Sequence, residues 1–145
     1  MTLYHDNLVL GNALRNAFAN QDRPAIQSLI TADFVWMLPG DNAVSGDVTG
    51  VDGVFDRFAA LDSYGVDISI EHVVVNQHGL AFILHNTGSH GGRVLDEYLV
   101  TVITVRGGRA ARLETFLSDI PMRPVWLPRR AGQQRRHRRR PATTG

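Results

Sequence analysis

The amino-acid sequence predicts a single α+β domain, in which helices come first and a curved sheet follows. Apolar residues up to about Leu61 recur mainly at three- and four-residue steps, which is typical of helices. From Val66 onward apolar and polar residues alternate, and glycine turns divide this stretch into four runs. A hydrophobic content of 43% over 145 residues suits one domain with one buried core.

Three helices are expected, and all of them precede the four alternating runs. The first has an apolar stripe formed by Leu3, Leu8, Leu10, Leu14, Ala17 and Phe18. Asp22 can cap a second helix, with Pro24 in its first turn. The third helix is expected from about Val51 to Leu61, where apolar residues again form one stripe.

One strand is expected before the third helix and four strands after it. Residues 34–38 are all apolar and stop at Pro39-Gly40, and the loop that follows has room for a short strand at Val44. The later strands are expected at 66–71, 80–87, 94–105 and 110–118, with glycines in the turns between them. Consecutive strands joined by such turns form an antiparallel meander.

The pattern ends near Ile120. Three prolines surround Trp126, which indicates an extended segment with Trp126 as a surface anchor. Residues 129–145 have little apolar content and are expected to be disordered. The prediction is therefore a folded domain at 1–128 and an arginine-rich tail at 129–145.

Charge is divided unevenly between these two parts. All fifteen basic residues are arginines; seven of them follow Leu127, whereas all fourteen acidic residues precede it. Residues 1–128 thus carry eight arginines against fourteen acids, a net charge of −6, and the tail carries +7. A negative body repels nucleic acid, so any such affinity is expected from the tail alone. A tail without a function remains an alternative.

Composition also limits the compartment and the cofactors. No apolar run approaches the roughly 20 residues of a membrane helix, so no membrane association is expected. The first ten residues lack the pattern of a signal peptide, and the chain has no cysteine. These features predict a cytoplasmic protein. The six histidines show no paired spacing typical of metal sites, so neither a metal nor another cofactor is expected.

Several segments, taken in order over residues 3–127, resemble the SnoaL-like polyketide cyclase family of the nuclear transport factor 2-like and ketosteroid isomerase-like superfamily. The opening segments are Val35-Trp36-Met37-Leu38-Pro39-Gly40, Ser45-Gly46, and Gly50 before a helix. The later ones are Gly91-Gly92-Arg93, Leu95-Asp96, Gly107-Gly108-Arg109, the strand 113–116, Asp119 and Trp126.

The resemblance implies a cone-shaped α+β barrel, in which three N-terminal helices pack on a strongly bent, mainly antiparallel sheet around a pocket. Members of this superfamily include aldol-type polyketide cyclases, steroid isomerases, epoxide hydrolases, dehydratases and proteins without catalysis. The fold therefore does not fix the reaction. The resemblance also implies a homodimer formed through the outer face of the sheet.

Strand alternation identifies the side chains that would face such a pocket. The expected inward residues are Val35, Met37, Phe82, Leu84, Asn86, Leu95, Glu97, Leu99, Leu113, Thr115, Leu117 and Asp119. This set is mostly apolar with a few polar groups, as in small-molecule sites. A bulge would turn the other side chains of a strand inward, so that Trp36, His85, Asp96 or Tyr98 would face the pocket instead.

Three residues are candidates for proton transfer. Asp119 matches the acid that closes this pattern in the family and could transfer a proton, or it could be a cap or turn residue before Pro121. Glu97 could act as a base inside the cone, or lie in solvent near a hairpin. His85 could be an acid or a base, or belong to a dimer face or the core.

Three further residues are candidates for binding. Trp36 could stack on a ligand or belong to the core. Asn86 and Thr115 could orient a carbonyl oxygen, or bond to nearby backbone.

The chain departs from the family at several of these positions. Met37 stands where many SnoaL-like proteins have a histidine. Phe82, Leu84 and Thr115 stand where limonene-type epoxide hydrolases have an arginine and two aspartates, so the hydrolase triad is not expected.

The expected function is an enzyme of secondary metabolism, such as antibiotic biosynthesis. It would cyclise or isomerise a largely apolar, polyketide-like intermediate by positioning and limited acid–base help. The alternative is a noncatalytic ligand-binding or dimeric assembly module of the same fold.

Overall fold

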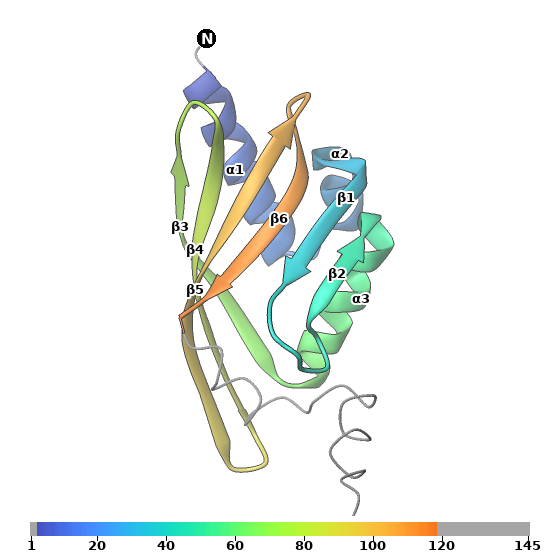
Figure 1. Cartoon of the computed structure of the whole chain (residues 1–145), viewed down its shortest axis with the longest axis vertical. Helices are drawn as coiled ribbons and strands as arrows, with labels where there is room; N and C mark the ends of the chain where they lie inside the picture. The colour runs from blue at the N-terminus through green and yellow to red at the C-terminus, as the bar shows by residue number, and fades with distance from the viewer. Residues whose placement is uncertain (1–2, 119–145) are drawn as a thin grey trace, which may run out of the picture.

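The computed structural model describes residues 3–118 and confirms the α+β class (Figure 1). Its elements are α1 (Leu3–Ala19), α2 (Arg23–Leu29), β1 (Ile30–Leu38), β2 (Gly46–Thr49), α3 (Gly50–Ser63), β3 (Val66–Val75), β4 (Gly79–His90), β5 (Arg93–Arg106) and β6 (Arg109–Leu117). None of the described helices is long and apolar enough to cross a membrane. Trp126, the domain boundary at 128 and the arginine-rich tail lie outside the described residues.

All six strands belong to one sheet, in the order β2-β1-β6-β5-β4-β3. β1 runs parallel to β6 and every other neighbouring pair is antiparallel, so the predicted meander of β3 to β6 is confirmed. Figure 1 shows α1 behind the sheet, α3 beside β2, and the yellow β4–β5 hairpin extending past the rest of the sheet. The helices cover one face of the sheet, and no described helix lies on the other face.

Local sequence features determine where the helices and strands begin and end. The start of β1 and the position of β2 differ from the prediction. The Asp22 side chain accepts a hydrogen bond from the Ala25 backbone N–H at 3.3 Å, which confirms the predicted cap of α2. β1 begins at Ile30 because this residue, directly after α2, already has extended backbone angles. The short strand expected at Val44 lies at β2 instead, because residues 42–45 form a turn closed by side-chain-to-backbone hydrogen bonds.

The core lies between the helices and the covered face of the sheet. Burial alternates regularly along β4 and β5, so every second side chain of these strands faces the helices. In β3 the register shifts between Ile70 and His72. Such irregularities increase the local bend and twist of a strand, and here they help the sheet to curl around the helices.

Gly11 allows α1 to approach β3 closely. A Cβ atom at this position would lie 2.6 Å from Val73 Cγ1 and 3.2 Å from Leu80 Cδ1. We expect Gly11→Leu to lower the free energy of unfolding by about 2–3 kcal/mol in urea denaturation, because overpacking displaces side chains and backbone. Asn12→Leu, on the exposed side of the same helix, should change it by less than about 0.5 kcal/mol. Equal losses in the two variants would contradict the close approach.

Candidate functional site

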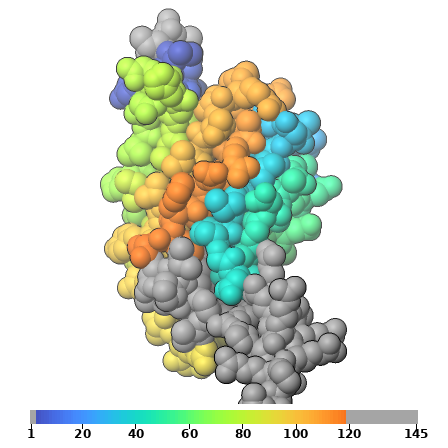
Figure 2. All heavy atoms as spheres, viewed as in Figure 1, coloured from blue at the N-terminus to red at the C-terminus, as the bar shows by residue number. Residues whose placement is uncertain are grey.

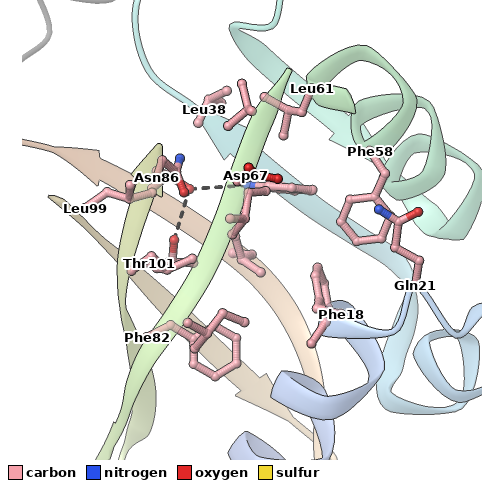
Figure 3. Close-up of a pocket in the computed structure, with 18 of the residues that line it drawn as sticks. Phe18, Gln21, Leu38, Phe58, Leu61, Asp67, Phe82, Asn86, Leu99 and Thr101 are labelled. Atoms are coloured by element: carbon pink, nitrogen blue, oxygen red, sulfur yellow. Dashed lines mark hydrogen bonds between the residues drawn. The ribbon is translucent and has the colours of Figure 1, made fainter. Parts of the chain in front are cut away.

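A cavity of about 240 Å³ lies between the helices and the covered face of the sheet (Figure 3). Its wall is mainly apolar, with a few polar groups. The lining residues are Phe18, Ala19, Gln21, Trp36, Leu38, Phe58, Leu61, Asp62, Val66, Asp67, Ile68, Ile70, Phe82, Leu84, Asn86, Leu99, Thr101, Leu113 and Thr115.

Three aromatic rings form one side of the cavity. Phe18, Trp36 and Phe58 come from α1, β1 and α3, and they pack edge to face. Their ring centroids are 6.1 Å (Phe18–Trp36), 5.5 Å (Phe18–Phe58) and 5.9 Å (Trp36–Phe58) apart. Mutual edge-to-face packing holds the rings in place, so they offer a preformed surface to a flat apolar molecule.

Arg57 holds Trp36 in position through its ring and its backbone carbonyl. Arg57 is 4% exposed, and the central carbon of its guanidinium lies 5.0 Å from the Trp36 ring centroid. It donates to the carbonyl oxygens of Trp36 at 2.7 Å, Val44 at 3.0 Å and Gly46 at 2.7 Å. One side chain thus joins α3 to β1, to the β1–β2 connection and to the start of β2.

Two threonines form a hydrogen-bonded pair on the sheet side of the cavity. Thr101 and Thr115 are cross-strand partners with Oγ1 atoms 3.2 Å apart, and Thr115 Oγ1 accepts the Trp36 indole N–H at 3.3 Å (dashed lines in Figure 3). The two hydroxyls carry two hydrogens, and their mutual bond uses one. Whichever threonine donates to the other, a second hydroxyl hydrogen is available to an acceptor in the cavity.

Asn86 and Glu97 form a second polar pair on the same side. They are cross-strand partners on β4 and β5, 3% and 2% exposed, and Asn86 Nδ2 donates to Glu97 Oε1 at 3.3 Å. Asn86 lines the cavity, whereas Glu97 is not among the lining residues. Within the described chain, Asn86 Oδ1 is buried and has no hydrogen-bond partner. Glu97 therefore positions the amide of Asn86, and Asn86 presents that amide to the cavity.

The mouth of the cavity is polar. Gln21, Asp62 and Asp67 line it and are exposed, and Gln21 Nε2 donates to Asp62 Oδ2 at 3.4 Å. These two aspartates could not be recognised from the sequence, because acids at a helix end and in a strand are usually plain surface residues.

The prediction of which side chains of β1 face the cavity is wrong. Trp36 and Leu38 line the cavity, whereas Val35 and Met37 lie on the opposite side of the strand and are half-buried. Every residue from 34 to 38 is apolar, so the sequence offered no polar alternation to show which side faces inward. The structure buries the larger rings beneath the helices.

On the other strands, the side chains that face inward are the ones predicted to do so. The cavity is lined, as expected, by Phe82, Leu84, Asn86, Leu99, Leu113 and Thr115. Leu95 is buried in the core and Leu117 is half-buried, and neither lines the cavity. Asp119 lies outside the described residues.

His85 lies on the outer face of the sheet. Its Nε2 contacts the Asp96 carboxylate, its Nδ1 lies 4.0 Å from Glu71 Oε1, and its ring stacks on Tyr98 at 4.3 Å between centroids. The structure therefore separates His85 from the cavity and from Glu97. Among residues 3–118, no group of three or more histidine, aspartate or glutamate side chains is arranged to hold a metal ion.

Comparison with known sequences finds a matching family model and uncharacterized relatives. A family model described as a SnoaL-like domain matches residues 12–113. An uncharacterized protein of Mycobacterium tuberculosis is 32% identical over 108 residues, which cover 71% of this chain and 82% of the relative. A protein of Mycobacterium bovis, also uncharacterized, matches equally well.

Comparison with solved structures shows an NTF2-like fold. Bal32a, from a soil-derived mobile gene cassette, superposes with a TM-score of 0.73 at 22% identity, covering 82% of this chain and 94% of that one. An NTF2-like protein of Burkholderia xenovorans gives 0.68 at 18% identity, covering 79% and 91%. A candidate SnoaL-like polyketide cyclase from Jannaschia sp. CCS1 gives 0.65 at 18% identity, covering 81% and 89%.

Proposed function

The chain belongs to the SnoaL-like domain family, and on that premise we propose that it is an enzyme that encloses a largely apolar, polyketide-like intermediate and promotes its cyclisation or isomerisation. The observation that carries the proposal is the cavity with an aromatic cluster on one side and hydrogen-bonding groups on the other. The candidate polyketide cyclase of Jannaschia sp. shares the fold, which supports this reaction class.

Positioning would supply much of the rate. Leu84 and Leu99 are cross-strand partners on one wall, and the aromatic cluster of Phe18, Trp36 and Phe58 forms the other. A flexible chain folded between these walls would hold its reacting atoms close together. Well-oriented intramolecular reactions gain about 7–11 kcal/mol at best from such orientation.

Acid–base help would be limited. Glu97 acts on the cavity through Asn86, whose amide it orients. The threonine pair can donate to a carbonyl oxygen of the substrate and stabilise negative charge that develops there. Asp119 remains a proton-transfer candidate from the sequence, and Asp67 at the mouth is a second one.

A noncatalytic ligand-binding module is the alternative function. Among the described residues that line the cavity, Asp62 and Asp67 are the only ionisable side chains, and both are exposed at the mouth. A cavity interior without a charged group suits storage or transport of an apolar molecule as well as it suits a positional enzyme.

Incubation with linear polyketide-like intermediates, followed by chromatography and mass spectrometry, tests the two functions. We expect a ring-closed or isomerised product, and we expect Asp119→Asn to lower its rate of formation by about 10²–10⁴-fold if Asp119 transfers the proton. Glu97→Gln should lower kcat more than it raises KM. Recovery of every bound intermediate unchanged would favour the binding module, and full activity of both variants would refute the acid–base roles.

We also propose that a second copy of the chain covers the outer face of the sheet. Figure 2 shows this face, with β6 in orange beside β1. Tyr98 and Phe116 are 58% and 52% exposed there, next to Val100 and Val102. The ion pair of Arg112 and Glu114 adds both charges to the patch, so a two-fold related copy would meet complementary charge.

Light scattering coupled to gel filtration tests this dimer. Val102→Glu places a charge in the centre of the patch and is expected to convert a dimer into a monomer, because buried unpaired charges are costly. Val9→Glu, on α1 behind the sheet and 56% exposed, is the matched control and should leave the dimer intact. A monomeric wild-type chain at 100 µM, roughly the upper range of such measurements, would refute the proposal.

A further inference from the structure

We propose that the cavity selects molecules that carry a hydrogen-bond donor as well as an acceptor: a hydroxyl or N–H group that binds Asn86 Oδ1, and a carbonyl oxygen that binds the threonine pair of Thr101 and Thr115. The inference rests on the proposed function, because it concerns the same cavity. It adds which polar groups the ligand has and which side chains recognise each of them.

The acceptor of the site is the amide oxygen of Asn86. Glu97 determines which way this amide points, because a carboxylate accepts hydrogen bonds and therefore faces the Nδ2 group. Oδ1 is left buried and without a partner in the described chain. A buried acceptor of this kind destabilises the protein until a donor reaches it, and in this position that donor comes from the cavity that Asn86 lines.

The donor of the site is the threonine pair. Thr115 Oγ1 already accepts the indole N–H of Trp36, and the two hydroxyls share one of their two hydrogens. The remaining hydrogen is the group that the pair can offer. Both threonines are no more than 3% exposed, so a carbonyl oxygen in the cavity can accept this hydrogen without competition from bulk water.

Asn86 and the threonine pair lie on the same wall of the cavity. Along β4, Asn86 and Phe82 face the same side, and Phe82 is the cross-strand partner of Thr101. Figure 3 shows Asn86 and Thr101 on the same side of the cavity, with Phe18 and Phe58 opposite. A ligand that satisfies both points therefore has its donor and acceptor on the edge that faces the sheet and an apolar body that faces the rings.

Four naphthalene compounds test the inference by isothermal titration calorimetry on the full chain. They are naphthalene, 2-naphthol, 2-acetylnaphthalene and 7-hydroxy-2-acetylnaphthalene, which carry neither group, the donor, the acceptor, and both on the same long edge. We expect the donor and the acceptor each to strengthen binding by about tenfold, since one bonds to the unpartnered Asn86 Oδ1 and the other to the remaining hydroxyl hydrogen of the threonine pair. The compound with both groups should therefore bind most tightly.

Asn86→Leu identifies the donor's partner. In this variant 2-naphthol should bind no more than about twofold more tightly than naphthalene, while 2-acetylnaphthalene keeps its advantage. Leu95→Met, which conserves the volume of a buried residue of β5 that does not line the cavity, is the matched control and should keep both advantages. If Asn86→Leu does not fold, the comparison of the four compounds on the wild-type chain still decides the question.

The outcomes separate this inference from the proposed function. Equal binding of all four compounds to the wild-type chain would overturn the inference, because water would then satisfy Asn86 and the threonines, and it would leave the apolar cavity standing. An undiminished advantage of 2-naphthol in Asn86→Leu would likewise overturn the assignment to Asn86. Failure of all four compounds to bind would overturn both.

Discussion

Replacing Arg57 with methionine is expected to lower the free energy of unfolding by about 3–5 kcal/mol. The variant removes the donors of three carbonyl groups, those of Trp36, Val44 and Gly46, at a position that is 4% exposed. Methionine fills a similar volume but donates no hydrogen bond, so these carbonyls lose a partner. Guanidinium denaturation followed by circular dichroism measures the loss.

Two further substitutions separate the hydrogen bonds from the charge. Arg57→Lys keeps the charge but cannot form the forked set of bonds, so its loss should fall between those of wild type and Arg57→Met. Arg109→Met removes an exposed arginine at the start of β6 and should cost no more than about 1 kcal/mol. A loss below about 1 kcal/mol in Arg57→Met would show that the three carbonyl bonds contribute little.

The alternation of apolar and polar residues determined how well the fold and the inward faces could be predicted. In β4 and β5 polar residues such as Asp96 separate the buried ones, and the predicted parity matches the structure. In β1 the whole stretch is apolar, and the prediction chose Val35 and Met37 over Trp36. In such a strand, the side that faces inward is the side that the helices cover, and this follows only from the tertiary packing.

The cavity itself depends on contacts between elements that are distant in sequence. Phe18 and Phe58 were expected in helical stripes, but that they meet Trp36 was not visible in the sequence. Arg57 left a signal, because it lies three residues after Val54 and four before Leu61, both on the buried face of α3. A charged residue at such a position requires buried partners. The sequence could not identify them, because they are backbone carbonyls of β1, of the β1–β2 connection and of β2.

Replacing Leu84 with tryptophan is expected to weaken binding of 7-hydroxy-2-acetylnaphthalene by more than about 100-fold. Leu84 is 7% exposed, lies opposite Leu99 and lines the cavity of about 240 Å³. An indole at this position occupies the space between the sheet and the aromatic cluster, so a two-ring ligand can no longer enter. A loss of this size corresponds to about 2.7 kcal/mol, which is within the range of a blocked apolar site.

Ile83→Trp is the matched control for this experiment. Ile83 is the preceding residue of β4, so its side chain points to the opposite face of the sheet, and it does not line the cavity. The control should change the affinity by less than about twofold. Calorimetry on both variants, with thermal unfolding to show that each is folded, measures the difference. Unchanged affinity in a folded Leu84→Trp chain would place the ligand outside the cavity, and with it both the positional chemistry and the pairing with Asn86 would fail.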